Sequence, residues 1–266
     1  MLTRLAETDA HEGPVFVEGE QALYFTTQRH GCRVDIKRLS LADGALSTVR
    51  ANANAANGMA LDPDGALLVC EQQPAGIARV DPTSGRRETV VDAYRGRPLN
   101  SPNDIVVRSD GSLWFTDPSY AHLQDFGAEP QLGEHVYRYA GGGLELVADG
   151  FEKPNGLAFS PGESVLYVGD SEACTVEAFD VLDGRRLANR RRFATIAEGS
   201  PDGLKVDPGG NVYTTGGLGL LVFDPTGTLV REIDLAGAVN FALAGERLLV
   251  TTDDAIWAVD AAAACL

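Results

Sequence analysis

A short phrase recurs six times along the chain and constrains the fold more than any other feature. Each copy begins with a carboxylate or an amide side chain, followed by an alternating apolar run, a polar turn with glycine, and a second apolar run. A repeat of roughly 40 to 50 residues is typical of β-propeller blades. The six copies begin at Glu12, Asn57, Asn103, Asn155, Asp202 and Asn240.

Strand-forming sequence is dense within these copies. Aromatic and β-branched runs beside Gly or Asp turns predict strands at Ala22–Thr27, Ser112–Thr116, Ser164–Gly169, Asn211–Thr215 and Arg247–Thr251. A second hairpin pattern follows, for example from Ile77 to Val91, from Val136 to Gly150 and from Leu220 to Leu235. Each copy therefore carries about four strands, which is the content of one propeller blade. The prediction is an all-β, six-bladed β-propeller.

The repeat runs through most of the chain without a linker, so one domain is predicted over residues 1–266. The last copy ends at Ile256–Asp260, and Leu2–Glu7 is expected to complete that blade, because propellers close the ring to remove sheet edges. Little helix is expected, apart from a short turn near Val91–Tyr94. Residues 119–135, here called the insert, have no strand pattern and are expected to cover part of the channel mouth.

Charge and composition narrow the classes of partner. The formal net charge is −16 and the pI is about 4.6, a balance that repels phosphate backbones and argues against nucleic-acid binding. The sequence shows no signal-peptide core and no apolar run near the roughly 20 residues that span a bilayer. Its four cysteines form no CxxC pair and no zinc-like spacing. A cytoplasmic monomer or small homo-oligomer without disulfides is expected.

The first residues of the six copies are candidate metal ligands. In a propeller, the residue just before each innermost strand lies at the mouth of the central channel, so these side chains would converge. A single Asn-Gly pair indicates a turn, but six oxygen-bearing side chains in register favour a shared role. Calcium binds six to eight oxygen ligands. No Cys or His stands at these positions, which argues against a zinc site of the thiolate or imidazole kind.

Four longer phrases resemble a known family: HEGPVFV, SPNDIVVRSDGSLWFTDPSY, KPNGLAFSPGESVLYVGDS and SPDGLKVDPGGNVYTT. They resemble the family of gluconolactonase, senescence marker protein and luciferin-regenerating enzyme, most closely the gluconolactonase branch. The resemblance covers nearly the whole chain. It implies a six-bladed propeller with one divalent cation in its channel, usually calcium, with Mg²⁺, Mn²⁺ or Zn²⁺ as alternatives. It also implies metal ligands at Glu12, Asn155 and Asp202, with Asn103 facing both metal and substrate.

The resemblance implies hydrolysis of a sugar lactone, with the cation polarising the carbonyl. Asp202 is the first candidate for the general base. Asp104 is the second candidate, although a structural role is favoured for it. Some relatives carry an Arg two residues before the Asn of the ND phrase, where this chain has Ser101. Sugar recognition is therefore expected to differ, with substrate contacts predicted at Asn103, Asn100, Tyr120 and Gln124.

Two alternatives remain open at this stage. The same donor set would serve a related ester or organophosphate hydrolase. A propeller can also be a non-catalytic platform that binds a ligand. A serine hydrolase is not indicated, because the chain has no GxSxG phrase. His11 stands beside Glu12, and an exposed place before the strand is favoured over contact with the site.

Overall fold

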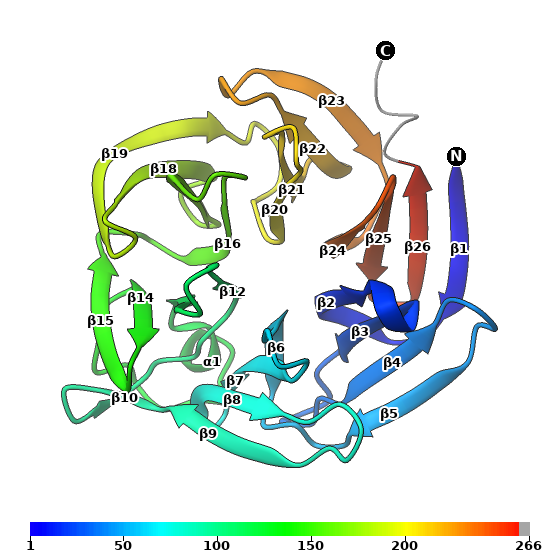
Figure 1. The fold of residues 1–266 in the computed structure, drawn as a ribbon, viewed down its shortest axis with the longest axis horizontal. Helices are drawn as coiled ribbons and strands as arrows, with labels where there is room; N and C mark the ends of the chain where they lie inside the picture. Colours follow the sequence, from blue (N-terminus) through cyan, green and yellow to red (C-terminus); the bar gives the residue numbers. More distant parts are fainter. Residues whose placement is uncertain (261–266) are drawn as a thin grey trace.

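A computed structural model describes residues 1–260, which form a ring of six four-stranded antiparallel sheets (Figure 1). The predicted all-β, six-bladed propeller is confirmed. In each of the first five blades, four consecutive strands run from the axis outward. Cys265 lies outside the described residues, and Cys32, Cys70 and Cys174 are free thiols.

The strands of the first five blades follow the repeat. Blade one holds β2 (Ala10–Val17), β3 (Ala22–Thr27), β4 (Ile36–Ser40) and β5 (Leu46–Arg50). Blade two holds β6 (Ala56–Leu61), β7 (Leu67–Gln72), β8 (Ala75–Val80) and β9 (Arg87–Val91). Blade three holds β12 (Ile105–Val107), β13 (Leu113–Asp117), β14 (His135–Ala140) and β15 (Gly143–Ala148). Blade four holds β16 (Pro154–Phe159), β17 (Val165–Asp170), β18 (Thr175–Leu182) and β19 (Arg186–Thr195). Blade five holds β20 (Leu204–Val206), β21 (Val212–Gly216), β22 (Gly219–Phe223) and β23 (Leu229–Asp234).

The sixth blade closes the ring with a strand from the other end of the chain. It holds β24 (Ala238–Ala244), β25 (Arg247–Thr252) and β26 (Ala255–Asp260), and β1 (Leu2–Glu7) pairs antiparallel with β26. Figure 1 shows β1 at the outer edge of this blade. The predicted closure by Leu2–Glu7 is therefore confirmed.

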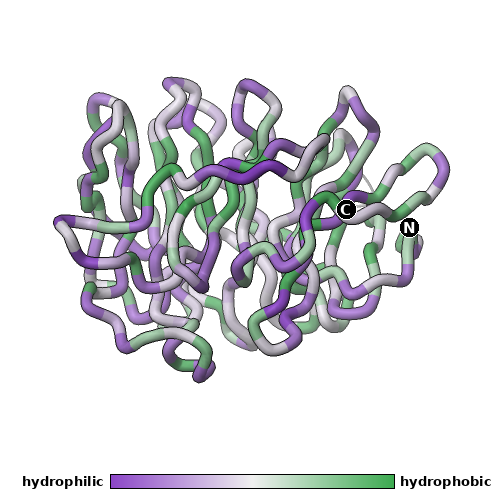
Figure 2. Tube along the Cα trace, turned by 90° about the horizontal axis from the view of Figure 1, so that it is seen from below, coloured by the Kyte–Doolittle hydropathy of each residue, from purple (hydrophilic) through white to green (hydrophobic). Residues whose placement is uncertain are grey.

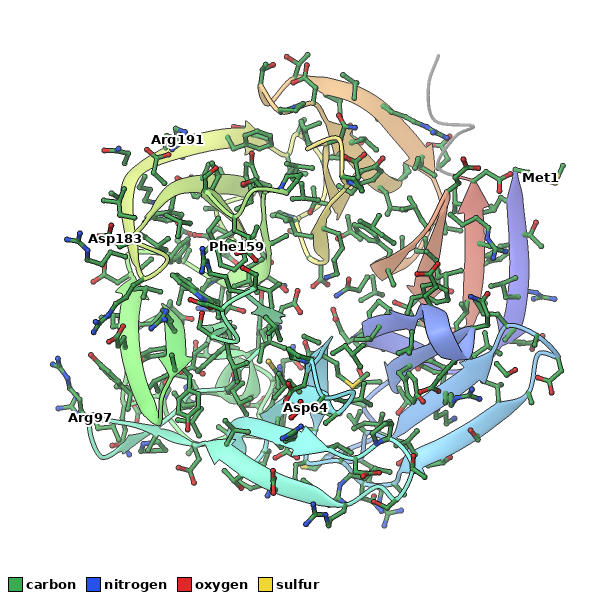
Figure 3. All side chains as sticks on the ribbon, viewed as in Figure 1. Met1, Asp64, Arg97, Phe159, Asp183 and Arg191 are labelled. Atoms are coloured by element: carbon green, nitrogen blue, oxygen red, sulfur yellow. The ribbon has the colours of Figure 1, made fainter. Side chains whose placement is uncertain are left out.

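The hydrophobic core lies between neighbouring blades. The aromatic residues of the second strands are buried there, including Trp114, Phe115, Tyr167 and Tyr213. The side view in Figure 2 shows apolar segments along the strands and polar residues at many loops of both faces. In Figure 3, Phe159 lies inside the ring, whereas Arg97, Asp183 and Arg191 extend from its outer edge.

The helix prediction was wrong. Val91 ends β9, and β10 (Ala93–Tyr94) pairs with β11 (Arg97–Pro98). Arg95 and Gly96 between them both have positive φ, which gives the two-residue turn of a small hairpin. The short helices are instead η1 (Glu18–Glu20) and α1 (Tyr120–Leu123), which opens the insert. Among the described residues, no helix has the length and apolar character needed to cross a membrane.

Candidate metal centre and substrate pocket

A polar pocket of about 470 Å³ opens at the end of the channel where the inner strands begin. It is lined by the first residue of five of the six sequence repeats: Glu12, Asn57, Asn103, Asn155 and Asp202. The sixth, Asn240, donates its Nδ2–H to Glu12 Oε2 at 2.8 Å. The structure therefore brings all four predicted metal ligands to one pocket and gives Asn240 a supporting contact.

The glycines after these residues serve close contact between blades rather than turns. The amide of Gly58 donates to the carbonyl of Asn103 at 2.8 Å, and that of Gly156 donates to the carbonyl of Asp202 at 3.0 Å. A Cβ at position 156 would lie 2.2 Å from the Asp202 carbonyl oxygen. Only glycine fits there, and each contact fixes the next residue around the ring.

Gly156→Ala is expected to lower the free energy of unfolding by about 1–3 kcal/mol, because the added methyl group must push Asp202 away. Gly162→Ala is the matched control in the same blade, since a Cβ there meets nothing within 4 Å. Urea unfolding in the presence of a chelator measures both variants. Equal stabilities would contradict the close inter-blade contact.

Glu12 and Asp202 place two carboxylates close together. Glu12 is 3 % exposed, and its Oε2 accepts hydrogen bonds from the Gly13 amide and from Asn240. Burial raises the pKa of Glu12, with His11 opposing this shift. Desolvation, followed by the charge of Glu12, raises the pKa of Asp202 well above its ordinary value. Among residues 1–260, neither carboxylate forms an ion pair with a basic side chain, so a cation would relieve their repulsion.

The amide side chains complete an oxygen-rich donor set. The Oδ1 atoms of Asn57 and Asn103 are buried and have no hydrogen-bond partner within the described residues 1–260. Asn155 donates its Nδ2–H to Ser171 Oγ at 3.0 Å and to the Tyr120 hydroxyl at 3.5 Å. No cluster of three or more His, Cys, Asp or Glu side chains able to hold a metal occurs within residues 1–260. The arrangement fits a hard cation bound by mixed carboxylate and amide oxygens.

Two buried aspartates hold the loops that carry Asn103 and Asn155. Asp117, at the end of β13, accepts hydrogen bonds from the amides of Asn100 and Ser101 at 3.0 and 2.9 Å. Asp170, at the end of β17, accepts from the amides of Glu152 and Lys153, both at 2.8 Å. In both loops, the two amides belong to the residues three and two positions before the asparagine that lines the pocket. Neither aspartate was predicted from the sequence, although FTDP and VGDS end the same strand in consecutive repeats.

The pKa of Asp117 predicts how stability depends on pH. Burial raises this pKa from 3.8 to about 7, although the two amides favour the charged form. Because the folded-state pKa is the higher one, this contribution is complete below about pH 4 and is lost as pH rises through about 7. The raised pKa values of Glu12 and Asp202 act in the same direction.

The free energy of unfolding of the metal-free protein is therefore expected to fall between about pH 4.5 and 7.5. Exposed aspartates with lowered pKa values, such as Asp81 and Asp224, change the stability only below about pH 3.8, their ordinary pKa. Their contribution therefore lies outside this window. Urea titrations in chelator at several pH values measure the slope. A stability that rises with pH across the window would contradict the assignment.

Asp104 lies beside the pocket but faces away from it. Its carboxylate accepts a hydrogen bond from the Ile105 amide at 2.9 Å and pairs with the Lys205 ammonium at 3.6 Å. Lys205 lines a second cavity, at the opposite mouth of the channel. Adjacent residues of an extended chain point to opposite sides, so Asn103 lines the pocket and Asp104 does not.

The remaining predicted contacts fall in different places. Tyr120 and Gln124, from the insert, line the pocket, and so does His11, which pairs with Asp253 at 2.7 Å. Burial raises the pKa of Tyr120 to about 12, so its hydroxyl stays protonated. Asn100 instead lines another cavity and donates to the carbonyl of Gly133 at 3.0 Å. The structure thus places Asn100 at the base of the insert.

Comparison with known proteins gives a consistent assignment. The model of the SMP-30/Gluconolactonase/LRE-like region matches residues 10–254. The gluconolactonase of Zymomonas mobilis is 31 % identical over 239 residues, covering 81 % of this chain and 67 % of that protein. Lactonohydrolase oryL of Aspergillus oryzae is 28 % identical over 212 residues, covering 69 % of this chain. The chain spans only 48 % of the length of that fungal relative.

A solved structure of a gluconolactonase from Xanthomonas campestris superposes with a TM-score of 0.89 at 34 % identity. The superposition covers 97 % of this chain and 89 % of that one. A luciferin-regenerating enzyme has the same fold, with a TM-score of 0.82 at 18 % identity and coverage of 98 % and 95 %. Because the family model spans nearly the whole described chain, the chain belongs to the SMP-30/gluconolactonase/LRE-like family.

Proposed function

We propose that this chain is a metal-dependent lactonase that hydrolyses a gluconolactone-like sugar lactone to the aldonic acid. The observation that supports it is the pocket in which Glu12 and Asp202 meet the unpartnered amide oxygen of Asn103. Relatives named gluconolactonase and lactonohydrolase support the same reaction class. The donor set of Glu12, Asn103, Asn155 and Asp202 favours one divalent cation, with calcium as the first candidate.

The reaction breaks the ring ester by addition of water to the carbonyl carbon. A bound cation would supply polarisation of that carbonyl. Asp202, which lines the pocket beside Glu12, would accept the proton of the attacking water. The bond between the carbonyl carbon and the ring oxygen then breaks, and the ring oxygen takes up the proton held by Asp202 to become a hydroxyl group. Tyr120, which stays protonated, donates a hydrogen bond to the substrate.

Acid release from a lactone panel tests this function. Chelator-stripped protein would be assayed with glucono-1,5-lactone, an aryl ester and an organophosphate, with and without Ca²⁺, Mg²⁺, Mn²⁺ or Zn²⁺. Lactone hydrolysis restored by one metal is the expected result. Hydrolysis of the aryl ester or the organophosphate alone would assign the site to the alternative hydrolases. Metal binding without any turnover would indicate a ligand-binding propeller.

A further inference from the structure

Arg29 is the one arginine or lysine among the described residues that line the polar pocket. It lies in the connection between β3 and β4 of blade one, outside the six repeat positions, and its side chain is half-buried. Across the described chain, no carboxylate lies within ion-pair distance of it. An unpaired guanidinium at a pocket is notable in a protein of net charge −16, because acidic partners are abundant.

The insert holds the guanidinium at the rim of the pocket. Nη1 donates to the carbonyl of Gly31 at 2.7 Å, and Nη2 donates to Gln124 Oε1 at 3.0 Å. The Cζ atom lies 4.0 Å from the centre of the Phe126 ring, which itself packs against the core between blades one and two. These neutral contacts orient the group but leave its charge uncompensated. Because a guanidinium has five N–H donors, three remain for a ligand.

We propose that Arg29 is a specificity-determining residue that selects lactones bearing a carboxylate away from the reacting ester. This inference rests on the proposed lactonase function. The planar guanidinium matches a carboxylate with two parallel hydrogen bonds. A divalent cation would balance Glu12 and Asp202, which leaves the single charge of Arg29 for a single carboxylate. Glu172 also lines the pocket, but it is exposed, and within residues 1–260 it forms no ion pair with Arg29.

Ser101 stands where some relatives carry an arginine that contacts the substrate, so this chain cannot recognise its substrate through that position in the same way. Its side chain is fully buried, donates to the carbonyl of Pro118 at 2.6 Å and accepts from the amide of Ala121 at 3.1 Å. An arginine at this position would displace the start of the insert. The basic group of this pocket is therefore supplied from blade one by Arg29, and the insert that Ser101 anchors also orients it.

The test compares kcat and KM for three substrates of the metal-loaded protein: glucono-1,5-lactone, glucaro-1,4-lactone and 6-phosphogluconolactone. Arg29→Gln is expected to lower kcat/KM for the glucarolactone about 10- to 100-fold, mainly through KM, because a charged hydrogen-bonded pair is lost. Its activity on gluconolactone should change less than about twofold. Arg33→Gln, in the same connection but outside the pocket, is the matched control.

Each other outcome overturns a defined part of the inference. Equal losses on the neutral and carboxylated lactones would show that Arg29 only holds the insert. A larger loss of kcat/KM on the phosphorylated lactone than on the glucarolactone would show that Arg29 recognises a phosphate rather than a carboxylate. Normal gluconolactone turnover with no effect of Arg29→Gln on any substrate would reject the inference but keep the lactonase. No turnover of any lactone by the wild-type protein with metal would reject the proposed function itself.

Discussion

Glu12→Gln is expected to abolish metal-dependent lactone hydrolysis while the six blades remain folded. Glutamine keeps the shape of the side chain, and its carbonyl oxygen can accept the hydrogen bonds from Gly13 and Asn240. The substitution removes one of the two carboxylate charges that face each other in the pocket. A loss on the order of a thousandfold in kcat/KM is expected, because in the proposed mechanism a bound cation would stabilise the carbonyl oxygen electrostatically.

Calorimetric titration with calcium and acid release from gluconolactone together measure this effect. Glu172→Gln is the matched control, since Glu172 lines the same pocket but is exposed and lies outside the proposed donor set. The control should retain metal binding and turnover. Wild-type turnover in Glu12→Gln, with unchanged metal affinity, would remove Glu12 from the metal site. Thermal unfolding of both variants excludes a loss of fold as the cause.

The arrangement of the blades was predictable from sequence because the fold is repetitive. Six copies of one pattern give six independent indications of the same hairpin, so an error in one copy leaves the others unaffected. The end of the last copy at Asp260 also suggested that Leu2–Glu7 could complete the sixth blade, and β1 pairs with β26 there. The same register predicted that Glu12, Asn103, Asn155 and Asp202 would meet at one pocket, where the structure places them.

The supporting residues were not predictable in the same way. Asp117 and Asp170 act on backbone amides of loops that are distant in sequence, a contact that no local pattern reveals. Asn100 and Asn103 are both polar residues of one short loop, and only the folded backbone separates the one that faces the insert from the one that lines the pocket. Arg29 belongs to no repeat position, so its role depends on where the insert crosses to blade one.

Loss of a buried ion pair in blade two is expected to lower the free energy of unfolding more than any other change proposed for this chain. Glu71 is 0 % exposed, and Arg87 donates from Nε to its Oε1 at 3.0 Å, while Asn54 donates to its Oε2 at 3.1 Å. Arg87→Met removes the guanidinium and leaves a buried charge whose only remaining hydrogen-bond partner within residues 1–260 is Asn54. A loss of about 3 kcal/mol in the free energy of unfolding is expected, at the lower end of the range for broken buried pairs because Arg87 is partly exposed.

Two further variants separate this cause from a simple loss of packing. The double variant Glu71→Gln/Arg87→Met removes the charge as well, so it should recover much of the lost stability. Arg79→Met, in β8 of the same blade, breaks ion pairs with Asp62 and Asp64 nearer the surface and should cost less than about 1 kcal/mol. If the double variant were as unstable as Arg87→Met, the packing of the arginine stem rather than the uncompensated charge of Glu71 would account for the loss. Asn54 lies just before the pocket-lining residues Ala55 and Ala56. The uncompensated charge of Glu71 would therefore also loosen that side of the pocket. KM for the lactone should rise in Arg87→Met and return to the wild-type value in the double variant.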